Sequence, residues 1–317
     1  MKVSHEEGKI KVSGTDVTKQ RSHSTLSIPA TFVFPDTFVF PKAVTSMTTK
    51  PILIFLLVWQ TSCLVVHAQD ADTVKVELGS KTAKDGFRNE DEIRDKFNNW
   101  QTDPDAGAWL TAMNYEPTDI DNVTASKPHG EKADVEVTVR TKSGERVERI
   151  SIKLVSSPNG FNQIDKRWLA TYAKMWRMPS DVVEALKLYV GETPPHESSR
   201  DRKRMYLDEL DSDAQKAVID FFTANKDEIV SDLLAGDGVH AAGWMMVTFK
   251  ATDQPKWVIK SSADAIKCFG DGDVEITKAG NLKIGRITMQ RKGGDNCRDT
   301  ANMLQFKINP VQLFHAR

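Results

Sequence analysis

An acid and a lysine lie in two neighbouring segments that both alternate apolar and polar residues in the manner of β-strands. Asp134 begins the first alternation, in KADVEVTVR (132–140), and Lys153 lies in the second, in RVERISIKLV (146–155). The TKSG sequence between them is typical of a turn, so the two segments are predicted to form an antiparallel hairpin. Ser151 lies two residues before Lys153 and therefore points to the same face of its strand.

This combination of side chains is what metal-assisted hydrolysis of a phosphodiester requires. Carboxylate and backbone carbonyl oxygens are the ligands that Mg²⁺ prefers in proteins. The ion offsets charge on the scissile phosphate and lowers the pKa of a bound water, which a lysine can orient. Spacing alone does not separate this hypothesis from a simpler one, because Asp and Lys on an amphipathic hairpin are usually solvated surface residues.

The chain from residue 86 onward contains further helical and strand patterns around this hairpin. Ser212 is a candidate N-cap, and Trp168 and Trp176, on one predicted helix, are interpreted as core residues. The order of helix, hairpin, helices and strands predicts a mixed α/β or α+β fold rather than regular βαβ winding. The expected helices cover 86–100, 104–113, 161–176, 180–189, 212–225 and 226–234, and the expected strands cover 241–251, 273–277, 282–290 and 304–308.

Composition and charge describe a folded protein that is not basic as a whole. The 317 residues are 39% hydrophobic and carry a formal net charge of −1, which argues against non-specific coating of nucleic acid. Residues 276–317 differ, because eight Lys or Arg against two Asp give them a net charge of +6. Cys63, Cys268 and Cys297 are widely spaced without a CxxC pair, so neither a disulfide framework nor a zinc site is expected. Unpaired thiols fit a reducing compartment.

The first 73 residues are interpreted as an extension that is poorly structured or spurious, ahead of a domain over 74–317. Within the extension, 51–68 is apolar and, read from Met47, is similar to a secretory signal that ends at Ala68. Polar residues interrupt the apolar run, so it is a poor membrane span. We favour upstream sequence translated from a start placed too early, and hence a cytoplasmic protein. Export remains the alternative.

Several blocks of the chain closely resemble the HinP-type restriction endonucleases, four-base cutters of the PD-(D/E)XK superfamily that act on GCGC. The resemblance covers Val76 to Leu313, and its last block is also similar to the related Msp-type enzymes. It implies a restriction-endonuclease-like core, with a central mixed sheet flanked by helices, and Mg²⁺-dependent cleavage of double-stranded DNA that leaves 5′ ends. A cognate DNA methyltransferase and a possible homodimer are implied as well, with no stable membrane association. The matching blocks are VELGSKTAKDGF (76–87), Asn89-Glu90, GFNQIDKRW (160–168) and MQRKGGDNCRDTANMLQFK (289–307).

Carried over residue by residue, the resemblance assigns the catalytic acid to Asp134 and the catalytic lysine to Lys153, with the Ile152 carbonyl as a metal ligand. Ser151 stands where the family has Gln and the wider superfamily has Glu or Asp, so a neutral and shorter oxygen ligand replaces a longer one. The interval from the acid to the lysine is also about two residues shorter than in the family. Glu90 matches a family acid that can bind metal through water, and its alternative role is to complement a helix dipole.

Two further segments are expected to contact DNA. Gln163, with Asn162 and Lys166, opens the predicted helix after the catalytic strand, and the resemblance makes Gln163 a candidate to wedge between base pairs; an ordinary helix cap is the alternative. The second segment combines glycines that let the backbone approach DNA with Arg and Lys for guanine and an acid for cytosine. It comprises Gln290, Arg291, Lys292, Gly293, Gly294, Asp295, Asn296 and Arg298.

The sequence therefore predicts a type II restriction endonuclease and leaves two alternatives open. One is a DNA-binding relative of such a nuclease that the Ser151 substitution has weakened catalytically. The other is a secreted nuclease, which takes the apolar segment at 51–68 as a functional signal.

Overall fold

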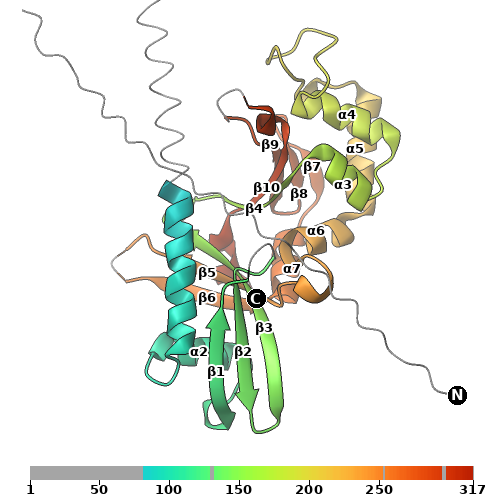
Figure 1. Ribbon diagram of the computed structural model, residues 1–317. Helices are drawn as coiled ribbons and strands as arrows, with labels where there is room; N and C mark the ends of the chain where they lie inside the picture. Colours follow the sequence, from blue (N-terminus) through green and yellow to red (C-terminus); the bar gives the residue numbers. More distant parts are fainter. Residues whose placement is uncertain (1–80, 129–131, 253, 295–297, 317) are drawn as a thin grey trace, which may run out of the picture. The chain divides into compact units, whose positions relative to one another are not determined.

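The computed structural model describes residues 81–128, 132–252, 254–294 and 298–316, all of which belong to one compact unit (Figure 1). The predicted extension over 1–73, with its signal-like segment, lies outside the described residues, as do the boundary at residue 74, Asp295 and Asn296. In the part of the chain that is described, no helix combines the length and the apolar character needed to cross a membrane.

Two helices lead into the sheets, and both agree with the sequence prediction. The first covers residues 81–98 and buries Ile93 and Phe97 on the side where its apolar residues repeat at helical spacing. The second, α2 (Pro104–Ala112), begins after Asp103, whose side chain accepts hydrogen bonds from two backbone amides of its first turn at 3.0 and 3.1 Å. Phe97 contacts Trp109 of α2, so the two helices share one apolar core.

Sheet A contains the predicted hairpin at its centre. Its strands run in the order β1-β2-β3-β5-β6, and the pairs are antiparallel except for β3 and β5, which are parallel. The mixed pairing expected for the central sheet is confirmed. Its strands are β1 (Ile120–Ser126), β2 (Val135–Thr141), β3 (Gly144–Val155), β5 (Trp244–Phe249) and β6 (Lys256–Ser261), of which β1 and β6 were not predicted.

Sheet B is antiparallel throughout, in the order β4-β10-β9-β8-β7. Its last four strands correspond to predicted ones, although β9 extends one residue further to Arg291. The predicted strand over 282–290 is divided by a turn at Gly285, which has φ +56°. The strands are β4 (Asn162–Arg167), β7 (Val274–Ile276), β8 (Leu282–Ile284), β9 (Ile287–Arg291) and β10 (Leu304–Ile308).

The helix predicted over 161–176 is wrong in its first half. Residues of β4 pair with β10, and only α3 (Leu169–Met175) is helical. Ladder hydrogen bonds to a strand about 140 positions later outweigh the local helical spacing. Trp176 is 4% exposed, as a core residue should be, but Trp168 precedes α3 and is 39% exposed, so its assignment to the core is wrong.

The remaining helices match their predictions, with one addition and one correction. The N-cap of α5 is Asp211, which accepts a hydrogen bond from the Ala214 amide at 2.8 Å, rather than Ser212, which is the first helical residue. The helix α7 follows β6 and was not predicted. These helices are α4 (Ser180–Val190), α5 (Ser212–Ala224), α6 (Lys226–Ala235) and α7 (Ser262–Gly270).

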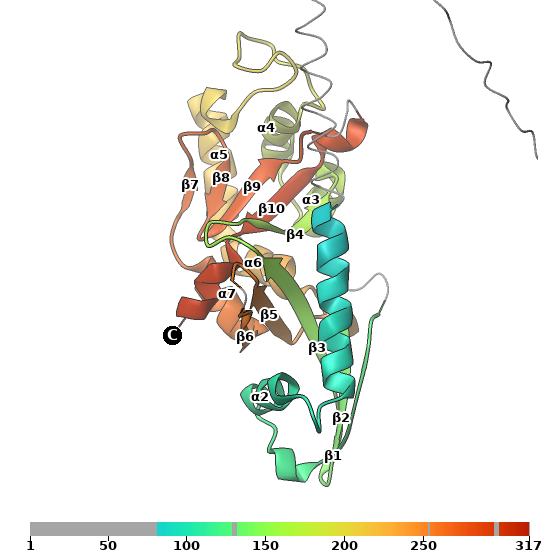
Figure 2. The same ribbon diagram turned by 90° about the vertical axis from the view of Figure 1, so that its left-hand side faces the viewer.

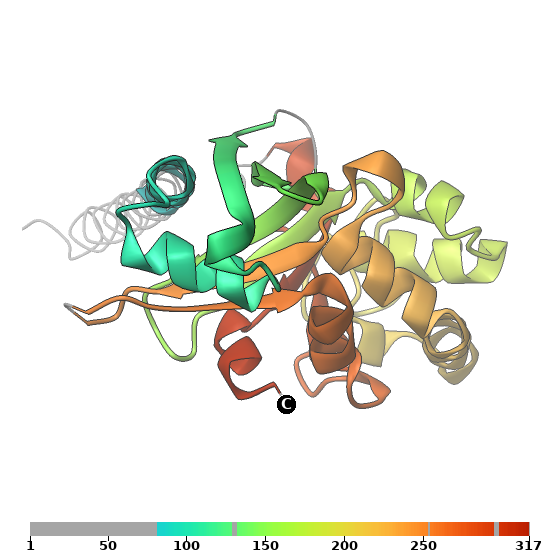
Figure 3. The same ribbon diagram turned by 90° about the horizontal axis from the view of Figure 1, so that it is seen from below.

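Apolar side chains pack on both faces of sheet A and form two cores. Met246 of β5 joins the smaller core with the helix at 81–98 and α2, whereas Met245 and Val247 join the larger core with α3 to α7 and sheet B. Figure 2 shows the helix at 81–98 running beside the strands of sheet A, and Figure 3 shows α6 and α7 away from that helix. The hairpin that carries Asp134 and Lys153 is thereby fixed between two packed layers.

Candidate active site

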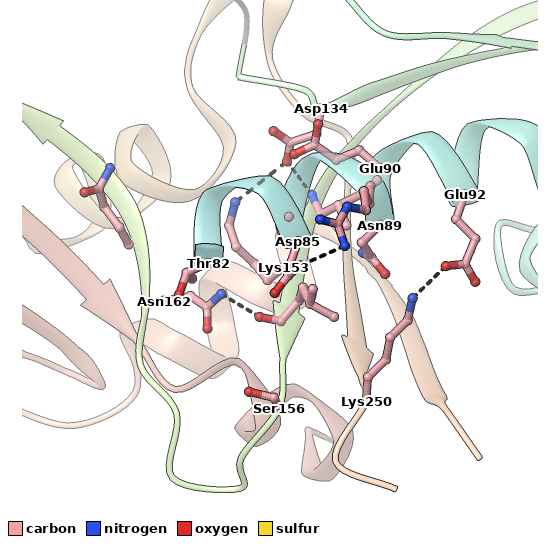
Figure 4. Close-up of a pocket in the computed structure, with 15 residues that line it drawn as sticks. Thr82, Asp85, Asn89, Glu90, Glu92, Asp134, Lys153, Ser156, Asn162 and Lys250 are labelled. Atoms are coloured by element: carbon pink, nitrogen blue, oxygen red, sulfur yellow. Dashed lines mark hydrogen bonds and ion pairs between the residues drawn. The ribbon is translucent and has the colours of Figure 1, made fainter. Parts of the chain in front are cut away.

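The hairpin brings the predicted catalytic acid and lysine together at the start of β2 (Figure 4). The Asp134 amide donates to the Ile150 carbonyl at 2.9 Å, which continues the ladder one residue beyond β2. The Asp134 side chain then turns toward β3, where its Oδ2 accepts the Ile152 amide at 2.6 Å. Lys153 Nζ lies 3.7 Å from the same oxygen, and both side chains are largely buried. The acid and the lysine therefore form a fixed pair rather than two separate surface charges.

The Ile152 backbone carbonyl, next to Asp134 and Lys153, is an oxygen acceptor that faces Asp134. In a β-strand the amide and the carbonyl of one residue point to the same side. The Ile152 amide points to Asp134, which lies just before the first residue of β2. The Ile152 carbonyl therefore faces the same side of β3, at the end of the β2–β3 pairing. Asp134 Oδ1 accepts no hydrogen bond from any residue that the structure describes. These two oxygens can therefore serve as ligands.

Ser151 is buried and turned toward the acid. It is 2% exposed, and its hydroxyl donates to Asp134 Oδ2 at 3.4 Å. The hydroxyl keeps its oxygen lone pairs, but its single proton is directed at the carboxylate. Ser151 therefore supports Asp134 as well as offering a neutral oxygen.

Glu90 reaches the site from the helix at 81–98. Burial raises the pKa of Glu90, and the nearby Asp134 carboxylate raises it further. Lys127, whose Nζ lies 2.9 Å from Glu90 Oε2, acts in the opposite direction and lowers this pKa. A cation is stabilised when it lies between two carboxylates that repel each other. Glu90 lies more than one turn inside its helix, so the alternative role at the helix dipole does not apply.

The acidic groups line a polar cavity of about 560 Å³ that Asn89 also lines. Asn89 is 2% exposed; its amide nitrogen lies 3.5 Å from Thr248 Oγ1, and its buried Oδ1 has no hydrogen-bond partner among the described residues. A buried oxygen without a donor indicates a missing polar partner such as water. Asn89 belongs to one of the blocks that carry the family resemblance, but no role was predicted for it from the sequence.

These residues fit a Mg²⁺ ion, by their chemistry and by the unpartnered Asn89 oxygen. Within the described residues, no group of three or more His, Cys, Asp or Glu side chains is arranged so that it could hold a metal ion. Mg²⁺ does not need such a group, since it usually retains several waters and is held by one or two carboxylates together with substrate phosphate. Asp134 and Glu90 would supply the carboxylates, and the Ile152 carbonyl would supply a neutral oxygen.

A row of amide side chains crosses the outer face of sheet B beside the cavity. Gln305 donates to Gln163 Oε1 at 2.8 Å and accepts from Gln290 Nε2 at 3.5 Å, which joins β4, β10 and β9. Lys166 lies opposite Gln305, and Lys307 lies opposite Gln163. Burial lowers the pKa of Lys307. Its ammonium has no acceptor in the part of the chain that the structure describes.

Gln305 and Lys307 were not singled out from the sequence, although a signal was present. The strand LQFKI alternates, and its apolar residues, among them Phe306, are buried in the larger core. The polar residues between them must therefore point to the opposite face. What the sequence did not reveal is that Gln163 and Lys166 lie on the adjacent strand.

Several predicted DNA contacts have partners within the protein. Asn162 donates to the Leu154 carbonyl at 2.9 Å and so connects β4 to the end of β3. Arg291 donates to the Val190 carbonyl at 2.8 Å and to Asn302 at 2.6 Å. Both side chains therefore connect neighbouring elements of the protein.

The glycine pair after β9 adopts a left-handed backbone conformation, and its predicted approach to DNA stays a prediction. Gly293 and Gly294 have φ angles of +64° and +56°, which L-residues rarely adopt, and a Cβ at either position would meet no atom within 4 Å. The pair is therefore required by conformation rather than by crowding. Arg298 precedes the short 3₁₀ helix η4 (Asp299–Asn302) and is exposed.

Two comparisons with known proteins found a match, and a third found none. The family model described as R.HinP1I restriction endonuclease matches residues 113–314. No curated protein sequence matches the chain. Among solved structures, a crystal structure of restriction endonuclease MspI in complex with its cognate DNA matches with a TM-score of 0.53 and 13% identity. The match covers 77% of this chain and 98% of MspI, and it shows a shared fold.

Proposed function

Since the chain belongs to the R.HinP1I restriction endonuclease family, we propose that it cleaves both strands of double-stranded DNA at GCGC with Mg²⁺ and leaves 5′ ends. Its class is that of a type II restriction endonuclease. One observation carries the proposal: Asp134 Oδ2 lies 2.6 Å from the Ile152 amide nitrogen and 3.7 Å from Lys153 Nζ, at the wall of a polar cavity.

Each group at the site has a distinct part in the reaction. Asp134 Oδ1 and the Ile152 carbonyl would hold the Mg²⁺ ion, with Glu90 bound through water and Ser151 as a weaker neutral ligand. The ion offsets charge on the scissile phosphate and lowers the pKa of a bound water. Lys153, held by Asp134, presents ammonium protons that orient the attacking water or stabilise a phosphate oxygen.

Recognition of GCGC requires donors for guanine and an acceptor for cytosine. Lys166 and Lys307 on the outer face of sheet B offer donors, Asp295 offers the acceptor, and Gln163 can wedge between base pairs. Phe161, next to β4, is 57% exposed and offers an apolar ring of the kind that enters base steps. The proposed DNA contacts are Gln163, Lys166, Gln290, Lys292, Gly293, Gly294, Asp295, Asn296 and Arg298, and we add Gln305 and Lys307. Asn162 and Arg291, which are bonded within the protein, would support these contacts.

Digestion of a sequenced plasmid, with the fragment ends read, tests the proposal. Cuts at GCGC alone, with 5′ overhangs and only when Mg²⁺ is present, are expected, and a plasmid methylated at GCGC should resist. Lys153→Ala should abolish cutting but still shift DNA in a gel. Lys142→Ala is the matched control, because Lys142 lies in the β2–β3 turn with a side chain that is 67% exposed. Binding by the wild-type chain without any nicking would replace this proposal with the non-catalytic alternative.

The partners and the compartment follow from the same proposal. A four-base site is frequent in any genome, so we propose a companion DNA methyltransferase that protects it, and a homodimer that acts on the palindrome. We also propose a cytoplasmic location, where the DNA lies and where a reducing environment fits the unpaired Cys268. Mass spectrometry of the mature N-terminus tests this location. A start near Val74 is expected, whereas a start at Gln69 would indicate export.

A further inference from the structure

Lys132 has a buried ammonium that contacts two separate elements of the fold. It lies two residues before Asp134, and its side chain is 16% exposed. Its Nζ donates to the Leu233 carbonyl at 2.5 Å and to the Ile164 carbonyl at 3.0 Å, and it lies 3.4 Å from Asp165 Oδ2. Three acceptors match the three protons of an ammonium group. The approach to the catalytic strand is thus bonded directly to β4 and to α6.

The β4 end of this link is itself rigid. The Asp165 side chain is 7% exposed, and its Oδ1 accepts the Tyr172 hydroxyl at 2.7 Å. Its Oδ2 accepts Arg167 at 3.1 Å in addition to Lys132. Asp165 lies on β4 between Gln163 and Lys166, the proposed DNA contacts. A displacement of Lys132 would therefore be transmitted to the strand that carries those contacts.

The α6 end of the link is shaped to admit the lysine. Leu233 lies in the last turn of α6, where carbonyls lack helical partners and a cation is favoured. Gly236 follows α6 with φ +74°, and a Cβ there would lie 3.3 Å from both Cβ and Cγ of Lys132. Glycine at this position therefore leaves the room that the lysine stem occupies.

We propose that Lys132 is a positioning residue that fixes the DNA-contacting strand β4 relative to the catalytic Asp134. Asp134 directly precedes β2 of sheet A, β4 belongs to sheet B, and the Lys132 side chain is bonded from the segment before β2 to β4. Lys132, Asp134, Lys153 and Gln163 also line one cavity of about 510 Å³. The distance across this cavity decides whether a phosphate held by β4 meets the acid and the lysine. The inference rests on the proposed nuclease function for its catalytic consequence.

The substitution Lys132→Met keeps most of the side-chain volume and removes the three hydrogen bonds. Single-turnover cleavage should slow by at least about tenfold, since misplacement of reacting groups by about 1 Å costs up to about a hundredfold. Affinity for a GCGC duplex, measured with Ca²⁺, should change by less than about threefold, since the backbone contacts that dominate affinity are retained. Gly236→Ala should act in the same direction through the lysine stem, which keeps the test valid if Lys132→Met does not fold.

Lys96→Met is the matched control. Lys96 Nζ lies 2.8 and 3.1 Å from two carboxylates near α2, and its side chain is 26% exposed, so its removal is a comparable loss away from β4. It should lower the melting temperature without changing the single-turnover rate. If the control slows cleavage as much as Lys132→Met does, the effect is one of general stability and the proposal is wrong.

Amide hydrogen exchange of the free protein tests whether Lys132 fixes β4 relative to Asp134, without DNA or catalysis. Peptides over 150–155 and 162–167 should exchange faster in Lys132→Met than in wild type, because the Ile152 amide is bonded to Asp134 and β4 is bonded to Lys132. The same peptides should be unchanged in Lys96→Met. Unchanged exchange in Lys132→Met overturns the proposal. A wild-type chain that never cuts DNA would refute the nuclease function while leaving this readout intact.

Discussion

The substitution Asp134→Asn separates the charge of the catalytic acid from its structural contacts. An amide oxygen can still accept the Ile152 amide, which lies 2.6 Å from Oδ2, so the start of β2 should keep its conformation. What is lost is the negative charge 3.7 Å from Lys153 Nζ, where the two side chains are 28% and 15% exposed. This exposure lies between that of surface and buried pairs, so the loss of stability should be about 2 kcal/mol.

The effect on catalysis should be much larger than the effect on folding. Loss of about 2 kcal/mol lowers Tm by about 6 °C and leaves a protein of ordinary stability almost entirely folded at 25 °C. Loss of the metal-binding carboxylate should slow cleavage by at least about a thousandfold, equivalent to about 4 kcal/mol. Any loss of activity beyond a few per cent therefore reports on the reaction rather than on unfolding.

Thermal melting by circular dichroism and single-turnover cleavage of a GCGC duplex measure the two effects. Asp103→Asn is the control. Asp103 Oδ2 also lies 3.1 Å from a lysine nitrogen, Lys96 Nζ, and Asp103 caps α2, away from the site. It should lose comparable stability and keep its rate. Cleavage by folded Asp134→Asn within tenfold of the wild-type rate would show that Asp134 does not hold the metal.

Three further predictions concern neighbouring residues. Ser151→Gln should raise the cleavage rate by about tenfold, read by the same duplex assay, because a longer oxygen ligand reaches the ion; a slower enzyme would mean that the buried hydroxyl is preferred. Lys307→Met should weaken binding to GCGC by about 1–3 kcal/mol in a gel-shift titration, with little loss on unrelated DNA if Lys307 reads guanine; an equal loss on both would identify a phosphate contact. The raised pKa of Glu90 means that its ionised form is disfavoured in the folded state. The folded protein therefore loses stability above the raised pKa, and it regains this stability as pH falls through that pKa. Glu90→Gln should therefore raise Tm at pH 7.5 in EDTA, and the gain should shrink toward pH 4; a lower Tm at both pH values would contradict this.

The catalytic hairpin could be predicted because everything that specifies it is local. Alternation over 132–140 and 146–155 defines two strands, and the short polar turn between them sets the register in which Asp134 meets Ile152. Lys153 follows on the same strand, so no distant contact is needed to bring the acid and the lysine together. Burial of alternate valines on β2 then fixes which face is inward.

The proposed DNA-contacting face of sheet B could not be predicted in the same way, because it is assembled from strands far apart in the sequence. Asn162 to Arg167 has too few apolar residues to indicate a strand, and the spacing beyond it favours a helix. Its strand character comes from pairing with β10, which also places Lys307 opposite Gln163. The strand β1 was missed for a related reason, since its polar sequence IDNVTAS is held by one pairing with β2.

The serine in the position between acid and lysine changes the balance of charge at the site rather than its geometry. A carboxylate at Ser151 would add a third negative group beside Asp134 and Glu90, whose pKa is already raised by its surroundings. A neutral hydroxyl that donates to Asp134 Oδ2 instead lowers the repulsion among these oxygens before any cation binds. The same neutrality weakens the attraction for a divalent ion. The preorganised site should therefore be more stable without metal and bind the metal less tightly, so half-maximal cleavage should require a higher Mg²⁺ concentration than in an enzyme with an acid at this position.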